Sequence, residues 1–200
     1  MTAPTHAETV VRLRDICDVS CGMPSSRAKA KDAGGKGLMA VTFPSILPGR
    51  LEPASFQPML ANDRAFESLA VPGTILMKSV PPFAAALVPT GLGEAFVGSN
   101  VIVLEVAPYA PVSKEYLVAY LNSGHCADSL VKLAEQAHGR LPMVRTSQVR
   151  GMAVPVPSPD DQRKLADLFF CTSEISHHLE TLRKLEWERF NTVFFDVVDR

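Results

Sequence analysis

Residues 158–200 read SPDDQRKLADLFFCTSEISHHLETLRKLEWERFNTVFFDVVDR, and beyond Pro159 this stretch contains neither proline nor glycine. Ser158 is a favourable N-cap residue, and Pro159 suits the first helical position. Asp161 stands where a capping box places an acidic side chain. The stretch predicts one helix of about 40 residues, which at ~1.5 Å per residue is roughly 60 Å long.

Apolar residues recur along this helix three and four residues apart, which is the a/d spacing of a coiled-coil seam. The seam residues are Leu165, Leu168, Ile175, Leu179 and Leu182, with Thr172 at the intervening step. The spacing breaks at Glu186 and Arg189. An apolar face resumes through Leu185, Phe190, Val193 and Phe194. The helix either folds back on its own domain or pairs with a partner; we favour pairing, because a domain with its own core has no obvious need for so long a rod.

The chain before residue 158 has a different composition and holds all but one of the 16 prolines. Short apolar runs separated by glycine and proline predict strands. These runs are residues 38–43, 73–80, 84–88, 100–106 and 152–156. Ser113 can cap a helix that ends at 123–124, and a second helix is expected over 127–137. We expect a mixed α/β (α+β) globular domain over residues 1–158, followed by a long C-terminal coiled-coil helix over 159–200.

The overall composition is that of an ordinary globular protein. The 200 residues (21.7 kDa) are 46% hydrophobic and 20% charged, with a formal net charge of −1. The first residues lack a basic segment followed by an apolar core, and no apolar run approaches the ~20 residues of a membrane span. We therefore expect a cytoplasmic protein with reduced thiols and no membrane contact.

Signatures of catalysis and metal binding are weak. Residues 79–83, SVPPF, approach a motif of amino-methyltransferases, but Val80 cannot accept the hydrogen bond that the motif requires. Residues 33–37, AGGKG, lack the serine or threonine that follows the lysine of a phosphate-binding loop. Cys17 and Cys21 are four residues apart, but no close second pair completes a zinc site. We expect no catalytic residue, no bound cofactor and no metal.

Basic residues are unevenly distributed. Between residues 20 and 50, five basic residues accompany a single acidic one, Asp32, in a stretch that we expect to be largely loop. Basic residues on loops suit contact with DNA phosphates, and arginine, lysine and glutamine also read base edges. The candidate DNA-binding residues are Arg27, Lys29, Lys31, Lys36, Arg50, Arg64, Lys78, Arg140, Arg145, Gln148 and Arg150. Solvated surface charge is the alternative interpretation.

The net charge is itself divided along the chain. Residues 1–78 carry +2, residues 79–158 are neutral, and residues 159–200 carry −3. The near-neutral total is therefore no argument against nucleic-acid binding.

Several motifs, in order, resemble the target-recognition domain of the specificity (S) subunit of type I restriction–modification enzymes. They are VVRLRDICDVSCG (10–22), LAVPGTILMKSV (69–80), VGSNVIVLEVAP (97–108) and SKEYLVAYLNS (113–123). The most specific block is GRLPMVRTSQVRGMAVPVPSPDDQRKLADLF (139–169), which is similar to the family's Pro-x-Pro strand and the start of its long helix. The sequence departs from the family pattern at Thr74, where an aspartate is usual, and at Glu105, near a commonly basic position.

The resemblance implies a non-catalytic DNA reader of an anti-phage defence system. Family members carry two recognition domains and two long helices packed as an antiparallel coiled coil, whereas this chain has one of each. It resembles a half-subunit that forms a homodimer or pairs with a second half. Expected partners are double-stranded DNA, a DNA adenine methyltransferase (M) subunit that binds S-adenosylmethionine, and a restriction (R) subunit where the system has one.

Two alternatives stay open. The chain could be a scaffold similar to a specificity subunit, recruiting partner proteins in a defence complex without reading DNA. It could also be an enzyme that stands alone and uses a site without a known signature.

Overall fold

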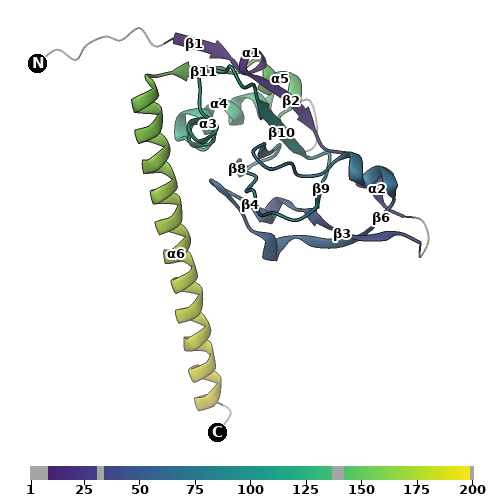
Figure 1. Cartoon of the computed structure of the whole chain (residues 1–200). Helices are drawn as coiled ribbons and strands as arrows, with labels where there is room; N and C mark the ends of the chain where they lie inside the picture. Colours follow the sequence, from purple (N-terminus) through teal and green to yellow (C-terminus); the bar gives the residue numbers. More distant parts are fainter. Residues whose placement is uncertain (1–8, 31–33, 137–141, 199–200) are drawn as a thin grey trace, which may run out of the picture.

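The structure is a computed structural model that describes residues 9–30, 34–136 and 142–198. A mixed α/β domain is followed by a single long helix that projects from it (Figure 1). This arrangement confirms the expected fold class. The strands are β1 (Thr9–Arg12), β2 (Cys17–Cys21), β3 (Lys36–Val41), β4 (Ile46–Leu47), β5 (Arg50–Leu51), β6 (Gln57–Ala61), β7 (Ile75–Lys78), β8 (Ala85–Leu87), β9 (Ala95–Val97), β10 (Val101–Val106) and β11 (Ala153–Val156). The helices are α1 (Leu13–Ile16), α2 (Ser25–Ala28), α3 (Lys114–Leu121), α4 (Gly124–Glu135), α5 (Thr146–Arg150) and α6 (Pro159–Val198), with 3-10 turns η1 (Phe43–Ser45), η2 (Pro53–Ser55) and η3 (Asp63–Glu67).

The central sheet is antiparallel, with strand order β2-β10-β7-β8, and both of its faces are covered. In β7, Ile75 and Met77 pack into the core that α3 and α4 cover, whereas Leu76 packs into the core on the other face. Side chains alternate between the faces of a strand, so a strand buried on both sides is an uninterrupted apolar run. This property made β7, β8 and β10 predictable.

A second, three-stranded sheet of order β6-β3-β9 lies beside the central one. It packs with α2 and η3 around Phe96, whose side chain is 1% exposed. The expectation that residues 20–50 are largely loop is wrong, since α2, β3, η1 and β4 all fall within it. These elements are short, and polar residues and glycine interrupt their apolar pattern.

The second helix of the domain begins earlier than expected. Ser123 Oγ accepts a hydrogen bond from the backbone N–H of Cys126 at 3.2 Å, so this serine is the N-cap of α4. The sequence predicts Ser123 at the end of α3 instead. Ser113 caps α3 as predicted, by accepting from the N–H of Tyr116 at 3.1 Å.

The two ends of the domain are joined. Strand β1 pairs antiparallel with β11, which places Thr9 opposite Val156 immediately before the long helix. The hydroxyl groups of Tyr116 and Tyr120 donate to the carbonyls of Pro155 (2.9 Å) and Ala153 (2.8 Å). Helix α6 therefore starts from a strand that is fixed on both sides.

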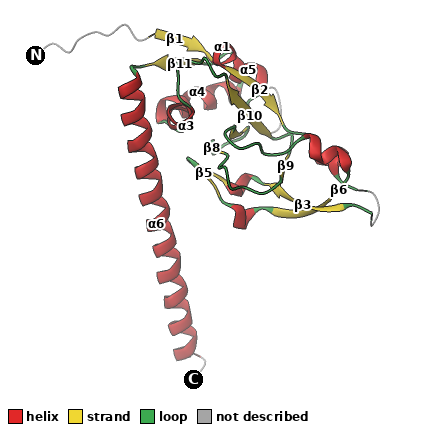
Figure 2. Cartoon of the chain, viewed as in Figure 1, coloured by secondary structure: helices red, strands yellow, loops and turns green. Residues whose placement is uncertain are grey.

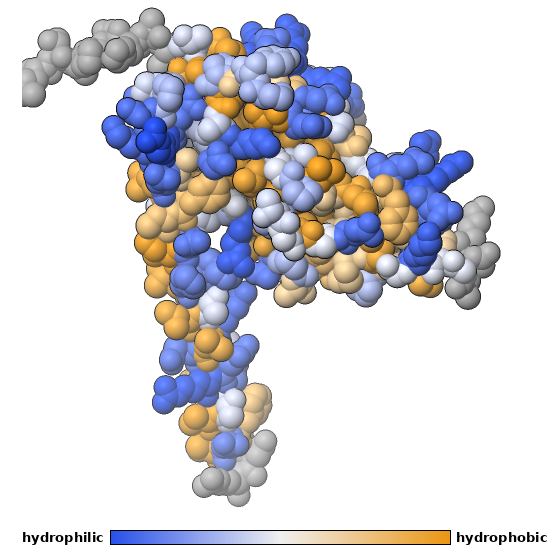
Figure 3. Space-filling model, in the orientation of Figure 1, coloured by the Kyte–Doolittle hydropathy of each residue, from blue (hydrophilic) through white to orange (hydrophobic). Residues whose placement is uncertain are grey.

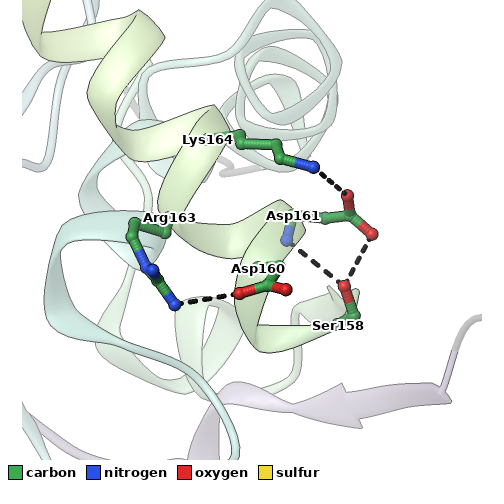
Figure 4. Close-up of polar contacts among 5 residues, drawn as sticks. All are labelled: Ser158, Asp160, Asp161, Arg163 and Lys164. Carbon is green, nitrogen blue, oxygen red and sulfur yellow. Dashed lines mark hydrogen bonds and ion pairs between the residues drawn. The ribbon is translucent and has the colours of Figure 1, made fainter.

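The start of α6 has the cap that the sequence predicts (Figure 4). Ser158 Oγ accepts from the N–H of Asp161 at 3.2 Å and donates to its Oδ2 at 2.7 Å. Asp160 and Asp161 lie in the first turn, where the helix dipole stabilises negatively charged side chains. Both pair with basic residues one turn along, Arg163 at 2.9 Å and Lys164 at 3.9 Å.

The first turns of α6 are anchored to the domain by a buried glutamine. Gln162 is 4% exposed. Its side-chain Oε1 accepts from the N–H of Ser113 at 2.8 Å, and its Nε2 donates to the carbonyls of Pro111 (2.8 Å) and Pro157 (3.1 Å). All the polar atoms of the amide are thus satisfied inside the joint.

A second anchor lies about three turns further on. The hairpin β4–β5 reaches α6 at its turn, where Ser173 Oγ donates to the carbonyl of Pro48 at 2.5 Å. Gly49 has φ = +80°, and a Cβ atom there would lie 3.0 Å from Cε1 of Phe169. Glycine is required at this turn both by its backbone conformation and by the close approach of the helix.

Residues 178–190 are all exposed. The C-terminal part of α6 projects from the domain (Figure 2). The five seam residues are 47–66% exposed. The first turns of α6 therefore pack on the domain, whereas its apolar seam is exposed; pairing of this seam with a partner stays a prediction. Within the described ranges, no helix is long and apolar enough to span a membrane.

Candidate nucleic-acid interface

Four of the candidate DNA-binding residues line one hollow of about 480 Å³. They are Arg27, Lys29, Lys36 and Arg64. Residues of α2, β3, β6 and η3 contribute to its lining. Of these elements, α2, β3 and β6 lie on the side of the domain away from α6 (Figure 1). We call this hollow the basic hollow. In the space-filling view, hydrophilic side chains project at this end of the domain (Figure 3).

Asn62, which follows β6, holds the walls of the basic hollow together. Its Oδ1 accepts from the N–H of Arg64 at 3.0 Å, and its Nδ2 donates to the carbonyls of Arg27 (2.7 Å) and Lys29 (3.2 Å). The Asn62 side chain therefore joins η3 to the end of α2, more than 30 residues earlier in the sequence. Sequence reasoning missed Asn62, although an Asn-Asp pair after a strand is a typical turn and capping signal.

The basic hollow is cationic overall. Among the described residues of its lining, four basic side chains accompany one carboxylate, that of Asp63, which gives a formal charge of +3. Lys36 Nζ lies 3.2 Å from Asp63 Oδ1 and 5.3 Å from the ring centroid of Phe66. Both ionic groups are exposed, so this pair is weak and leaves the hollow attractive to anions. Arg27, Lys29 and Arg64 are exposed around it.

Two other candidates lie elsewhere. Arg50 is on the β4–β5 hairpin beside α6, and its Nη2 lies 2.5 Å from Glu52 Oε2. Lys78 is half-buried at the end of β7, and burial lowers the pKa of its ammonium group. Neither residue lines the basic hollow.

The later group of candidates is divided between structural contacts and solvent. Gln148 Oε1 accepts from the N–H of Arg145 at 2.8 Å, and its Nε2 donates to the carbonyl of Leu133 at 2.9 Å. Arg150 donates twice to the carbonyl of Val19, from Nε at 3.1 Å and Nη2 at 2.6 Å. These two side chains hold α5 against its neighbours, although Arg150 is exposed, as Arg145 is. Lys31 and Arg140 lie outside the described residues.

Two of the four cysteines, Cys17 and Cys126, are buried. Burial raises the pKa of the Cys17 thiol to about 11 and that of Cys126 to about 12, which keeps both thiols protonated. In the part of the chain that the structure describes, no three His, Cys, Asp or Glu side chains gather closely enough to hold a metal ion.

The molecule thus belongs to a class of two-part folds. One part is a mixed α/β domain with a cationic hollow, and the other is a long helix with an exposed apolar seam.

Comparison with solved structures makes this class more specific. The chain is similar to one from a structural study of complex assembly and conformational transition of the type I R-M system (TM-score 0.58, 17% identity, 94% of this chain and 43% of that chain). It is similar to the HsdS subunit from Thermoanaerobacter tengcongensis (TM-score 0.55, 17% identity, 92% and 41%). It is also similar to the type I restriction–modification S subunit from M. genitalium (TM-score 0.54, 14% identity, 92% and 44%).

The fold is therefore that of the specificity subunit of type I restriction–modification systems, represented by one recognition-type domain and one long helix. The chain spans less than half the length of each of these structures. No family model matches the sequence. No curated protein matches it either.

Proposed function

We propose that this chain is the DNA-reading half of a type I-like specificity subunit. It binds one half of a bipartite target in double-stranded DNA and is itself not a catalyst. The observation that carries this proposal is the basic hollow, located on a specificity-subunit fold at the end remote from the long helix. The fold supports the subunit class, and the hollow supports contact with a polyanion.

The basic hollow is the proposed phosphate contact. Phosphate contacts position a protein on DNA, while base-edge contacts specify sequence. Arg27, Lys29 and Arg64 are exposed and free to reach a strand that lies across the hollow. Arg145 is a further exposed candidate. Gln148 and Arg150 donate hydrogen bonds that hold α5 in place.

The helix is the proposed pairing surface for a second copy, and its seam favours an antiparallel arrangement. Beyond Leu182 the seam continues through Glu186, Phe190, Val193 and Val197 if one four-residue step replaces a three-residue one, as in a coiled-coil stutter. An antiparallel copy then matches the whole seam in ten layers, which are five pairings that each occur twice. They are Leu165 with Val197, Leu168 with Val193, Thr172 with Phe190, Ile175 with Glu186, and Leu179 with Leu182.

A parallel pair is less favourable for two reasons. It would place Glu186 opposite the same carboxylate of the second copy, and like charges in a seam are destabilising. The antiparallel pair places that side chain beside Ile175 instead. The domain does not obstruct pairing, because Gln162 and Ala166 are buried against it while Leu165 and Leu168 remain exposed.

The methyltransferase subunits are proposed to dock on the helix pair, and any S-adenosylmethionine would bind to those partners. A homodimer would present two identical domains about a two-fold axis and so read a palindromic bipartite target. Comparing the methylomes of cells with and without the chain would show this motif. An asymmetric motif would indicate that the second half is a different chain.

The test is DNA affinity across a salt series, with the methyltransferase partner present. Removing phosphate contacts reduces the slope of log K against log salt by ~0.9 each, hence by about 3 per copy for three side chains. We expect this reduction for the combined variant Arg27→Ala, Lys29→Ala and Arg64→Ala. The matched control, Arg14→Ala, Lys132→Ala and Arg163→Ala, removes the same charge from exposed positions elsewhere.

Equal losses for both variants would contradict the assignment of the basic hollow. Absence of DNA binding by the wild-type complex at low salt would overturn the DNA-reading function, and the scaffold alternative would take its place. A retained complex with the methyltransferase would identify that case.

A further inference from the structure

We propose that Trp187 of one copy inserts into a hollow between the β4–β5 hairpin and α6 of a second copy. The proposal rests on the antiparallel homodimer described above and names a contact outside its seam. It would make the hairpin of each domain part of the dimer interface.

The receiving hollow has a volume of about 360 Å³. The hairpin contributes Leu47, Pro48 and Arg50 to its lining. The helix contributes residues from Phe169 to Glu180, namely Phe169, Thr172, Ser173, Ser176, His177 and Glu180. We call it the hairpin hollow. Its floor is apolar, since Leu47, Pro48 and Phe169 surround the small side chains of Ser173 and Ser176.

Trp187 is the only tryptophan of the chain and is 64% exposed. It stacks on Phe190 (ring centroids 5.3 Å apart), and Phe190 in turn lies 5.9 Å from Phe194. Tryptophan buries ~150–250 Å² in protein interfaces and is enriched at their centres. An exposed aromatic row on a projecting helix is therefore a strong candidate for a contact surface.

The register of the seam places Trp187 level with the hairpin hollow of the second copy along the helix axis. Antiparallel pairing places Glu186 opposite Ile175 of the second copy and Phe190 opposite Thr172. Trp187 then falls at the level of residues 172–175, the middle of the helical wall of the hairpin hollow. No adjustment of the seam is needed.

The same register also places Trp187 on the side of the helix pair on which the hairpin hollow opens. Trp187 follows the seam position Glu186 by one residue, or roughly 100° around the helix. Ser173 and Ser176 follow the seam positions Thr172 and Ile175 by the same step. In an antiparallel pair, residues that follow a seam position on one helix lie beside residues that follow a seam position on the other. Trp187 therefore faces the side of the second helix that carries Ser173 and Ser176, where the hairpin hollow opens.

The charges around the two surfaces are mixed in sign. Lys184 and Glu188 flank Trp187 on the same helix. The hairpin hollow contains Arg50 and Glu180. These two residues already pair with Glu52 and Arg183 of their own chain, so the proposed contact rests on apolar burial of Trp187 and not on a new ion pair.

The experiment follows tryptophan fluorescence and mass together over a dilution series of the full-length chain. As the mass doubles, the emission of Trp187 should shift to shorter wavelength. Acrylamide quenching should fall about twofold, as expected when the exposed fraction of the indole drops from 64% to roughly half that value. This measurement needs no variant and so does not depend on the folding of one.

The variant Leu47→Glu places a carboxylate in the hairpin hollow, away from the seam. It should abolish the blue shift in the dimer. Leu60→Glu makes the same change on the exposed face of β6 and should leave the shift intact.

A doubled mass with unshifted emission, or an unaltered shift in the Leu47→Glu dimer, would overturn the insertion of Trp187 while leaving the proposed function in place. A chain that stays monomeric at every concentration would overturn both the insertion and the homodimer. DNA binding, measured separately, would then report on the reading function alone.

Discussion

Replacing Gln162 with alanine should lower the free energy of unfolding by more than most substitutions of a single polar side chain do. The amide makes three hydrogen bonds at 2.8–3.1 Å within the joint between domain and helix. A net hydrogen bond contributes ~1 kcal/mol, and a buried partner left unsatisfied costs ~1–3 kcal/mol. We expect a loss of about 3 kcal/mol, which in a domain of this size lowers Tm by roughly 6–12 °C.

The assay is urea or thermal unfolding of a monomeric background, because dimerisation would add a concentration-dependent term to the free energy of unfolding. Gln57→Ala is the matched control, since Gln57 is exposed on β6. Gln162→Glu keeps the volume but removes the donor to two carbonyls, and it should destabilise at least as much as alanine. A change below ~0.5 kcal/mol for Gln162→Ala, or an equal change for Gln57→Ala, would refute the assignment of Gln162 as the anchor.

Two further outcomes follow from the structure. Replacing Leu179 and Leu182 with aspartate should give a monomer, because these residues form the centre of the seam. Light scattering measures the mass, and an unchanged mass would show that the seam is not the interface. Arg150→Met should lower stability by about 2 kcal/mol, through the loss of two charge-assisted hydrogen bonds to Val19, and leave the salt dependence of DNA binding unaltered. Arg145→Met is its control, and a reduced salt slope for Arg150→Met alone would assign that residue to DNA instead.

The long helix could be predicted in detail from the sequence because its signals are local. The cap at Ser158 and the absence of glycine and proline define where it begins and how far it extends. Strands β7, β8 and β10 of the central sheet were predictable because burial on both faces makes them largely apolar. Strands β1, β2, β6 and β9 were missed, since they are short or contain polar residues. In β6 the pattern is further interrupted by Pro58, which an edge strand accommodates.

The candidate interface was less predictable because it depends on distant pairing. Arg27, Lys29 and Lys36 are close in sequence, but Arg64 joins them only through the antiparallel register of β3 with β6. Gln148 and Arg150 were grouped with DNA-binding candidates by their position in a basic segment. Their partners, Leu133 and Val19, lie 15 and 131 residues away and carry no local signal.

The pairing of β1 with β11 has a consequence for the order of folding during synthesis. The first strand must wait for residues 153–156 before it gains its partner, and contacts of such large sequence separation form slowly. The apolar half of α6 is made only after this closing strand. Because domains tend to fold as units while the chain emerges, the globular part can close before the sticky helix is available. The globular domain is thus synthesised before the exposed apolar seam of α6. This order limits premature association between nascent chains.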